Sequence, residues 1–425
     1  MNSPVYRPWV IVGVSAVLIG FLGGLLVRNS SVKPVSAKPK ALVVFCAAGI
    51  RTPVEKIAWQ YEQEHGVPIQ LNFGGSLTLL ASISVAKCGD LYLPGDEDYL
   101  ALAREKGLVA ETLPVAGMSA VLAVRKGNPR GLRSLEDLLR EKVAVAQANP
   151  EATAIGKLTR EALERSGHWS ALKQRTIVFK PTVNDVANDL HLGTVDAGIV
   201  WDITARQYPE LETVPDPLLN DVQAKVGVGI LRSSDQPTAA LRFARYLGAR
   251  DKGQMEFARQ GYTLVDGDLW TATPEFVLYS GAMNRVAIEE TIQRFEQREG
   301  VRITRVYNGC GILVAQMKAG GRPDAYLTCD KSFVPPVADL FPEPPVEISD
   351  AEIVILVRQG NPQAVQTLAD LAKPGLRLGV AHPEQSTLGA LTRRLLERNG
   401  ILDRVMTNVA TQTPTATAPA LLFNP

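Results

Sequence analysis

Four short loops in the first half of the chain have residue types that suit the binding of a small anion. They are Cys46 to Ile50, Gly74 to Ser76, Asn149 to Gly156 and Thr182 to Val186. Small side chains let backbone N–H groups approach a bound group closely, and the N-terminus of a helix favours negative charge. Together the loops predict an anion site, although each loop taken alone is also an ordinary turn between a strand and a helix.

Such a site needs no charged side chain. Several N–H···O bonds to a charged ligand, each worth about 1.5–3 kcal/mol, can replace the hydration of a dianion. Arg51 follows the first loop and could approach the site, but an exposed arginine at a helix start is the alternative.

The histidines do not point to catalysis or to a metal. His65, His168, His191 and His382 occur singly at predicted loops or helix ends. The sequence contains no nucleophile elbow, no phosphate-binding glycine loop and no paired zinc ligands on a helix. We therefore predict no enzyme activity, no catalytic residues, no metal ligands and no cofactor.

Strands and helices alternate along the part of the chain that carries these loops. Apolar runs and helical spacing predict strands at 42–45, 69–73 and 90–93 and helices at 77–86 and 96–106. After Gly117 a second series begins with a strand at 121–124, and the chain returns through residues 226–230. This pattern predicts an α/β fold with a mostly parallel sheet in two lobes, whose ligand lies beyond the carboxyl ends of the strands.

The sequence repeats itself at an offset of 234 residues. The segment from Glu62 to Val67 is answered by Glu296 to Val301, and many other positions recur in register. Self-similarity at so long a period indicates whole domains copied in tandem. The second copy stops before an equivalent of Val195 to Trp201, so we expect it to be truncated and unable to complete a site alone.

Five segments of the first copy carry a family resemblance. They are Phe45 to Ile50, Phe73 to Leu79, Asp90 to Leu93, Asn149 to Glu151 and Gly198 to Trp201. They resemble the periplasmic molybdate-binding proteins of ABC transporters, over about residues 41–264 and, less completely, 274–416. The resemblance implies a type II periplasmic binding-protein fold, tandem duplicated, whose lobes close on molybdate or tungstate for delivery to a membrane permease.

The resemblance also implies ligand-binding positions, namely Gly49, Ser76, Ile155, Gly156, Val186 and Trp201. Two of them depart from the family. Gly49 stands where the family has a serine, and Trp201 stands where it usually has a tyrosine. An indole can donate one hydrogen bond but cannot accept one. We therefore expect an oxyanion site whose preference for molybdate over other anions stays open.

The second copy departs further from the family. Met283 takes the serine position of the first loop, Cys310 aligns with Ser76, and Ser386 and Thr387 are possible donors. The aromatic strand is missing. We expect this copy to bind the ligand poorly or not at all.

The cysteines are expected to be unpaired. In the strand order of the family, one strand separates Cys310 from Cys329, and two strand spacings of about 4.8 Å exceed the limit of about 7 Å between the Cα atoms of a disulfide. A bridge therefore requires the loops to lean together and is not favoured, and a soft-metal site would lack further ligands. Cys46 and Cys88 are expected to be small core residues at opposite strand ends.

The N-terminal segment predicts a membrane anchor. Residues 9–27 carry no charge, and at 1.5 Å per residue they span about 28 Å, enough for a bilayer core. We expect an uncleaved helix in the inner membrane that holds the domains on the periplasmic side. The alternative is secretion after a signal peptide is cleaved near Val35 to Ala37.

Composition supports two globular domains and no nucleic-acid partner. Basic residues number 45 against 44 acidic ones, and 46% of residues are hydrophobic. The basic residues are dispersed, whereas a nucleic-acid binder concentrates them on one face.

The predicted organisation is therefore an anchor and spacer at 1–40, a complete binding domain at 41–264, a linker at 265–273 and an incomplete domain at 274–425. Lobe one comprises 41–116 and 225–264, and lobe two comprises 117–224. The predicted function is capture of an oxyanion for an ABC transporter. The alternatives are a membrane-anchored accessory or sensory ectodomain that lost ligand capture, and a receptor for another small anion.

Overall fold

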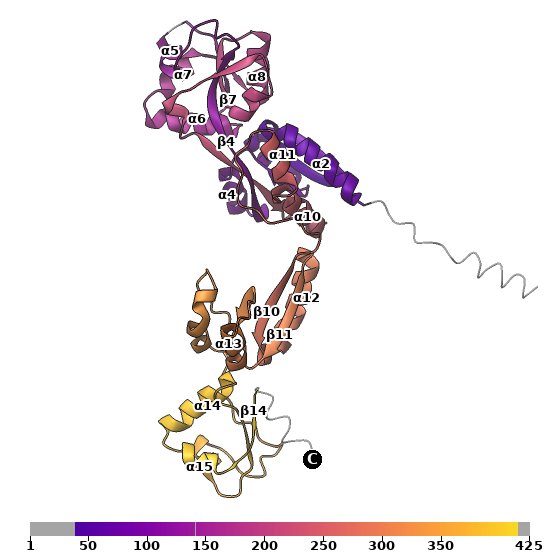
Figure 1. Ribbon diagram of the computed structural model, residues 1–425, viewed down its shortest axis with the longest axis vertical. Helices are drawn as coiled ribbons and strands as arrows, with labels where there is room; N and C mark the ends of the chain where they lie inside the picture. Colours follow the sequence, from indigo (N-terminus) through magenta and orange to yellow (C-terminus); the bar gives the residue numbers. More distant parts are fainter. Residues whose placement is uncertain (1–38, 141, 415–425) are drawn as a thin grey trace, which may run out of the picture.

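The structure is a computed structural model that describes residues 39–140 and 142–414 (Figure 1). Within these ranges every helix is too short or too polar to cross a membrane. The span predicted at 9–27 lies outside the described residues.

The first domain contains one nine-stranded sheet. Its order is β2-β1-β3-β9-β4-β7-β5-β6, and β8 also pairs with β4. The strands on one side are β1 (Leu42–Ala47), β2 (Ile69–Gly74), β3 (Leu91–Leu93), β4 (Val109–Arg125) and β9 (Gln223–Leu231). Those on the other side are β5 (Val145–Ala148), β6 (Thr176–Lys180), β7 (Ala197–Trp201) and β8 (Leu211–Val214). The sheet thus has the two-lobed α/β arrangement that the sequence predicts. It is mixed and not mostly parallel, however, because β4 and β9 run antiparallel to their neighbours.

Strand β4 belongs to both lobes. Its residues 109–119 pair with β9, whereas its residues 120–125 pair with β7 and β8. Gly117, close to this change of partner, also forms a bridge with Thr263. The lobes are therefore joined by continuous hydrogen-bonded strand and not by a loose loop.

Helices cover both lobes. Lobe one carries α2 (Arg51–His65), α3 (Ser76–Ala86), α4 (Asp98–Glu105), α10 (Pro237–Gly248) and α11 (Gly253–Arg259). Lobe two carries α5 (Leu135–Arg140), α6 (Ala154–Arg165), α7 (Trp169–Arg175), α8 (Val183–Leu192) and α9 (Asp202–Arg206). The short turns η1 (Ala48–Ile50) and η2 (Pro217–Leu219) complete the domain.

Helix α2 shows how the sequence defines one of these elements. Val54, Ile57 and Tyr61 recur at helical spacing and are buried against the sheet. The helix ends at Gly66, whose φ of 69° is left-handed and suits glycine. One large apolar core results, and it includes both lobes.

The region after residue 274 repeats part of this topology. Strands β10 (Glu275–Gly281), β11 (Arg302–Asn308) and β12 (Ala325–Leu327) are ordered β11-β10-β12, as β2-β1-β3 are. Phe276 pairs with Ile303 as Leu42 pairs with Ile69. The helices of this half are α12 (Arg285–Glu299) and α13 (Cys310–Lys318), preceded by η3 (Ala282–Asn284).

A second small sheet follows. It pairs β13 (Leu378–Ala381) with β14 (Val409–Thr413), and its helices are α14 (Thr387–Arg398) and α15 (Leu402–Met406). The turns η4 (Lys331–Phe333), η5 (Pro335–Leu340) and η6 (Leu368–Ala372) connect the two sheets. Among the described residues no strand here corresponds to β4, β7 or β9, and the apolar residues 353–356 are exposed.

The two regions touch through helices α10 and α12. The Thr238 hydroxyl donates to the carbonyl of Arg298 at 2.7 Å, and the Arg245 guanidinium donates to the carbonyl of Glu299 at 2.9 Å. Arg298 also forms an ion pair with Glu111. The contact lies on lobe one, away from the four predicted anion-binding loops (Figure 1).

Candidate functional site

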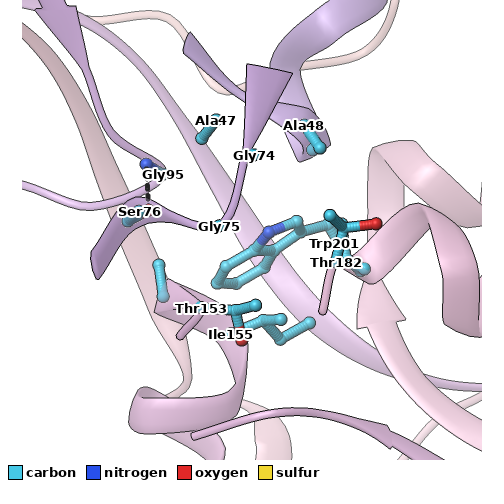
Figure 2. Close-up of a pocket in the computed structure, with 13 residues that line it drawn as sticks. Ala47, Ala48, Gly74, Gly75, Ser76, Gly95, Thr153, Ile155, Thr182 and Trp201 are labelled. Atoms are coloured by element: carbon cyan, nitrogen blue, oxygen red, sulfur yellow. Dashed lines mark hydrogen bonds between the residues drawn. The ribbon is translucent and has the colours of Figure 1, made fainter. Parts of the chain in front are cut away.

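A small cavity lies between the lobes where the four predicted loops meet (Figure 2). Its volume is about 20 Å³, whereas one buried water needs about 10–15 Å³. Its lining consists of small, apolar or hydroxyl side chains and one indole: Ala47, Ala48, Gly49, Gly74, Gly75, Ser76, Gly95, Thr153, Ala154, Ile155, Thr182, Val183 and Trp201. The cavity therefore suits a ligand of few atoms.

Three helices start at the cavity wall. Helix α3 begins at Ser76, α6 at Ala154 and α8 at Val183. The first N–H groups of a helix have no partner within it, and the helix dipole makes this end positive. Because α3, α6 and α8 come from three different strand-to-helix junctions, their positive ends converge on one space.

The caps of α6 and α8 decide which N–H groups stay available. Thr153 Oγ1 accepts the N–H of Gly156 at 3.1 Å, and Thr182 Oγ1 accepts that of Asp185 at 3.2 Å. The N–H groups of Ile155 and Val183 come earlier in their helices, and both residues line the cavity.

Two residues singled out from the sequence do not line the cavity. Gly156 donates its N–H to the capping threonine. Val186 is the fourth residue of α8, and Val183 at the start of that helix lines the cavity wall instead. The structure brings the other four, Gly49, Ser76, Ile155 and Trp201, to the same cavity.

Ser76 is held in place on two sides. Its Oγ accepts the N–H of Gly95 at 3.0 Å, and its carbonyl accepts the hydroxyl of Tyr92 at 2.7 Å. The side chain is buried, and among the described residues its hydroxyl hydrogen has no acceptor. The geometry leaves this hydrogen for a ligand.

Gly49 and Trp201 depart from the family pattern together, for a steric reason. A Cβ at Gly49 would lie 3.0 Å from Trp201 Cδ1, 3.2 Å from its Nε1 and 3.1 Å from Val183 Cγ1. The indole therefore fills the space that a serine side chain would take. The hydroxyl of Tyr262 donates to the carbonyl of Gly49 at 3.2 Å and fixes the loop.

The Trp201 indole lies across the cavity between Gly75 and Thr153 (Figure 2). The residue is 2% exposed, and no described residue accepts its Nε1–H. The Nε1–H is therefore available as a hydrogen-bond donor to a ligand in the cavity.

The two lobes are in contact around the cavity. The N–H of Leu77 donates to the carbonyl of Ala152 at 3.0 Å, and the Tyr99 hydroxyl donates to the carbonyl of Thr153 at 3.2 Å. A Cβ at Gly75 would lie 2.5 Å from the Ala152 oxygen, so only glycine permits this approach. The structure is therefore a closed arrangement of the lobes.

Among the residues that the structure describes, no charged side chain lines the cavity. Arg51 lies over the ring of Phe73, 4.8 Å from its centroid, and pairs with Glu55 at 2.8 Å. It is thus the exposed arginine at a helix start that the sequence allowed as the alternative. The wall offers neutral donors, which can bind an anion.

Several wall residues were missed by sequence reasoning. Gly95 follows β3, whose carboxyl end lies beside that of β1, so its position after a predicted strand is a usable signal. Ala154 and Val183 open two helices, where the exact first residue is hard to read from sequence.

In the second region the corresponding place holds two cysteines. Cys310 Sγ accepts the N–H of Cys329 at 3.3 Å, as Ser76 Oγ accepts that of Gly95. Both cysteines are free, as expected, although the two loops lean together over Gly281 and bring the side chains close. Cys46 is a core residue as expected, but Cys88 is exposed.

Known proteins similar to the chain are binding proteins. It is 30% identical over 228 residues to a protein of Haemophilus influenzae described as a binding protein, covering 53% of this chain and 92% of that one. It is 25% identical over 265 residues to the molybdate-binding protein ModA of Mycobacterium tuberculosis, covering 59% and 99%. The solved periplasmic molybdate-binding protein of Azotobacter vinelandii is 18% identical with a TM-score of 0.46, over 53% of this chain and 100% of that chain.

The sequence profile of the family described as "Bacterial extracellular solute-binding protein" matches residues 42–263 and again residues 276–423. The two matches together span most of the chain. The chain therefore belongs to the family of bacterial extracellular solute-binding proteins.

Proposed function

We propose that residues 41–264 capture a tetrahedral oxyanion of the molybdate or tungstate type outside the cytoplasm and deliver it to an ABC permease. The observation that carries this proposal is the convergence on one small cavity of three helix N-termini and the indole of Trp201, whose N–H has no acceptor among the described residues. Relatives that are named molybdate-binding proteins support the choice of anion.

The donors proposed for the ligand are the Ser76 hydroxyl, the N–H groups of Ile155 and Val183, and Trp201 Nε1. The N–H of Gly49 completes the set from the first loop. In this assignment the indole N–H replaces the hydroxyl that the family places at Gly49, since the two groups compete for one space.

The donor set favours anions without a proton. A protonated oxyanion such as hydrogen phosphate needs an acceptor for its own O–H, and no carboxylate of the described ranges lines the cavity. The hydroxyl groups of Thr153 and Thr182 are already bonded to the carbonyl of Asn149 and the carboxylate of Asp185. Molybdate, tungstate and sulfate are therefore expected to bind better than phosphate.

The lobes would open and close by bending of β4 and β9, near Gly117 and Val226. The closing contacts are the hydrogen bonds to Ala152 and Thr153 and the ion pair between Lys157 and Asp98 at 2.6 Å. Closure would remove water from the cavity and strengthen each hydrogen bond to the ligand.

Calorimetric titration of the purified protein with molybdate, tungstate, sulfate and phosphate tests the proposal. We expect one ion per chain and weakest binding for phosphate. No heat with any of the four anions would end the oxyanion proposal and favour the alternative, an ectodomain that kept the fold without ligand capture.

We further infer that residues 274–425 are a second copy of the domain. The repeated strand pairing and the double profile match support this inference. A stoichiometry of two ions per chain would contradict the expectation that this copy does not bind.

We also propose that residues 9–27 anchor the protein to the inner membrane without cleavage. Their uncharged sequence supports this. The intact mass of protein extracted from membranes tests it, because cleavage near Ala37 would shorten the chain and release it.

A further inference from the structure

Cys310 and Cys329 lie together at the start of helix α13. Cys329 N–H donates to Cys310 Sγ at 3.3 Å. A Cβ placed on Gly281 would lie 2.0 Å from Cys329 Sγ and 3.0 Å from Cys310 Sγ. Both sulfur atoms are free thiols and lie close to the same point beside Gly281, so the two side chains are neighbours.

Residue differences between the two copies accommodate this pair of cysteines. At the offset of 234 residues, Cys310 replaces Ser76 and Cys329 replaces Gly95, while Gly281 replaces Ala47. The methyl group that Ala47 carries would clash with the Cys329 sulfur if it were present at Gly281. The side chain gained at Cys329 is thus compensated by the methyl group lost at Gly281, on the neighbouring strand.

The two thiols do not belong to a larger metal-binding cluster. No group of three or more histidine, cysteine or acidic residues with metal-binding geometry occurs in the part of the chain that the structure describes. Structural zinc sites use four ligands. A reaction between the two sulfurs therefore explains their juxtaposition better than a shared metal.

We propose that Cys310 and Cys329 form a reversible dithiol–disulfide couple that reacts with small disulfides outside the cytoplasm. Cys329 is partly exposed, whereas Cys310 is 1% exposed. The order of reaction follows from this difference, because only Cys329 is open to an incoming molecule.

The chemistry is thiol–disulfide exchange with a disulfide R–S–S–R as the oxidant. Cys329 first passes its proton to the Cys310 thiolate that accepts its hydrogen bond, and the Cys329 thiolate then attacks one sulfur. The R–S–S–R bond breaks, and the departing R–S⁻ takes the proton from Cys310 as RSH, which leaves Cys310 as a thiolate again. The Cys310 thiolate then attacks Cys329 Sγ, which forms the internal disulfide and expels the second R–S⁻, protonated by solvent. One disulfide is reduced to two thiols, and two protein thiols are oxidised to one disulfide.

The surroundings prepare Cys310 for the second step. The pKa of Cys310 is lowered, chiefly by a hydrogen bond from the Cys329 thiol, which outweighs the effect of burial. The pKa of Cys329 is raised, because its proton is shared with the Cys310 thiolate and because it is buried. A thiolate is the form that attacks a disulfide.

The test uses the full chain with Cys46→Ala and Cys88→Ser, so that only the pair can react. This variant is equilibrated with mixtures of reduced and oxidised glutathione. Its free thiols are then alkylated, and its mass is measured by mass spectrometry. We expect two alkylated thiols under reducing conditions and none under oxidising ones. Two thiols at every ratio, or a bridge only between two molecules, would overturn the proposal.

The wild-type chain gives an independent measurement that needs no substitution. Trypsin releases Cys310 in the peptide 306–318 and Cys329 in the peptide 319–331, since Arg322 precedes a proline. We expect these two peptides to be linked after oxidation.

The substitution Gly281→Ala should prevent this link, because the new methyl group displaces the Cys329 sulfur. A disulfide link formed at the same glutathione ratio as in the wild type would contradict the geometry.

Single cysteine variants test the order of attack. When Cys310→Ser is added to the variant with Cys46→Ala and Cys88→Ser, Cys329 should be trapped as a mixed disulfide with glutathione. With Cys329→Ser, we expect adduct formation on Cys310 to be at least about tenfold slower because the sulfur is buried. A faster adduct on Cys310 would overturn the assigned order.

Discussion

Replacement of Trp201 by phenylalanine tests whether the indole N–H holds the ligand. The Trp201→Phe variant keeps an aromatic ring in a site that is 2% exposed but removes the donor Nε1–H. A hydrogen bond to a charged ligand is worth about 1.5–3 kcal/mol. The dissociation constant for molybdate should therefore rise about 10- to 150-fold.

A matched control separates this effect from loss of packing. Trp59 is 63% exposed on α2 and does not line the cavity, so Trp59→Phe makes the same chemical change elsewhere. We expect its affinity for molybdate to equal that of the wild type. Thermal unfolding of all variants without ligand shows whether the fold is intact.

The steric exchange between Gly49 and Trp201 adds a second arm. Gly49→Ser alone should abolish binding, because its Cβ would press against Trp201 Cδ1 at 3.0 Å. The double variant Gly49→Ser with Trp201→Tyr restores the residues that the family uses, so it should bind better than Gly49→Ser alone. Calorimetry with molybdate measures each constant. A folded Trp201→Phe protein that binds within twofold of wild type would refute the assigned role of the indole.

Three further outcomes follow from other contacts. Gly75→Ala should prevent closure of the lobes, since its Cβ would lie 2.5 Å from the Ala152 oxygen. We expect loss of molybdate binding, with an unchanged unfolding temperature of the empty protein. The radius of gyration from small-angle scattering should no longer decrease when molybdate is added. Glu296 forms an ion pair with Arg305 at 2.6 Å. The hydrogen bond from Arg305 is the main reason that the pKa of the Glu296 carboxyl lies below its ordinary value of 4.5. Its stabilisation of the second region is therefore complete above pH 4.5 and lost as the pH falls through the lowered pKa. Glu296→Gln should cost about 1 kcal/mol at pH 7 and nothing in strong acid, and a cost that is independent of pH in denaturant titrations would contradict this. Oxidation of Cys310 and Cys329 should stabilise the second region by about 3 kcal/mol through closure of a short loop, measured as a shift of its guanidinium midpoint that a reductant reverses.

Local elements of the first domain were well predicted from the sequence. The helix expected at 77–86 is observed as Ser76–Ala86, and the strand expected at 90–93 as Leu91–Leu93. These segments have a clear apolar period and lie between strong turn residues, so local physics decides them. The four loops reach one cavity because the carboxyl ends of neighbouring parallel strands share an edge.

Long-range features could not be predicted in the same way. The sequence predicts only a strand at 121–124, whereas β4 runs from Val109 to Arg125. Its first half includes Pro114 and irregular pairing with β9, which lies about a hundred residues away in the chain, so no local pattern marks it. The fit between Gly49 and Trp201, and that between Gly281 and Cys329, likewise depend on side chains that only the folded chain brings together.

Strand β4, which both lobes share, limits how the lobes move before a ligand binds. Because β4 and β9 stay hydrogen-bonded to each other across the junction, the lobes cannot rotate freely and can only bend or twist about adjacent strands. The empty receptor therefore samples few orientations, and most of them keep the two walls facing each other. Little orientational entropy is left to lose at capture, so even a ligand of a few atoms with a handful of hydrogen bonds can hold the lobes shut.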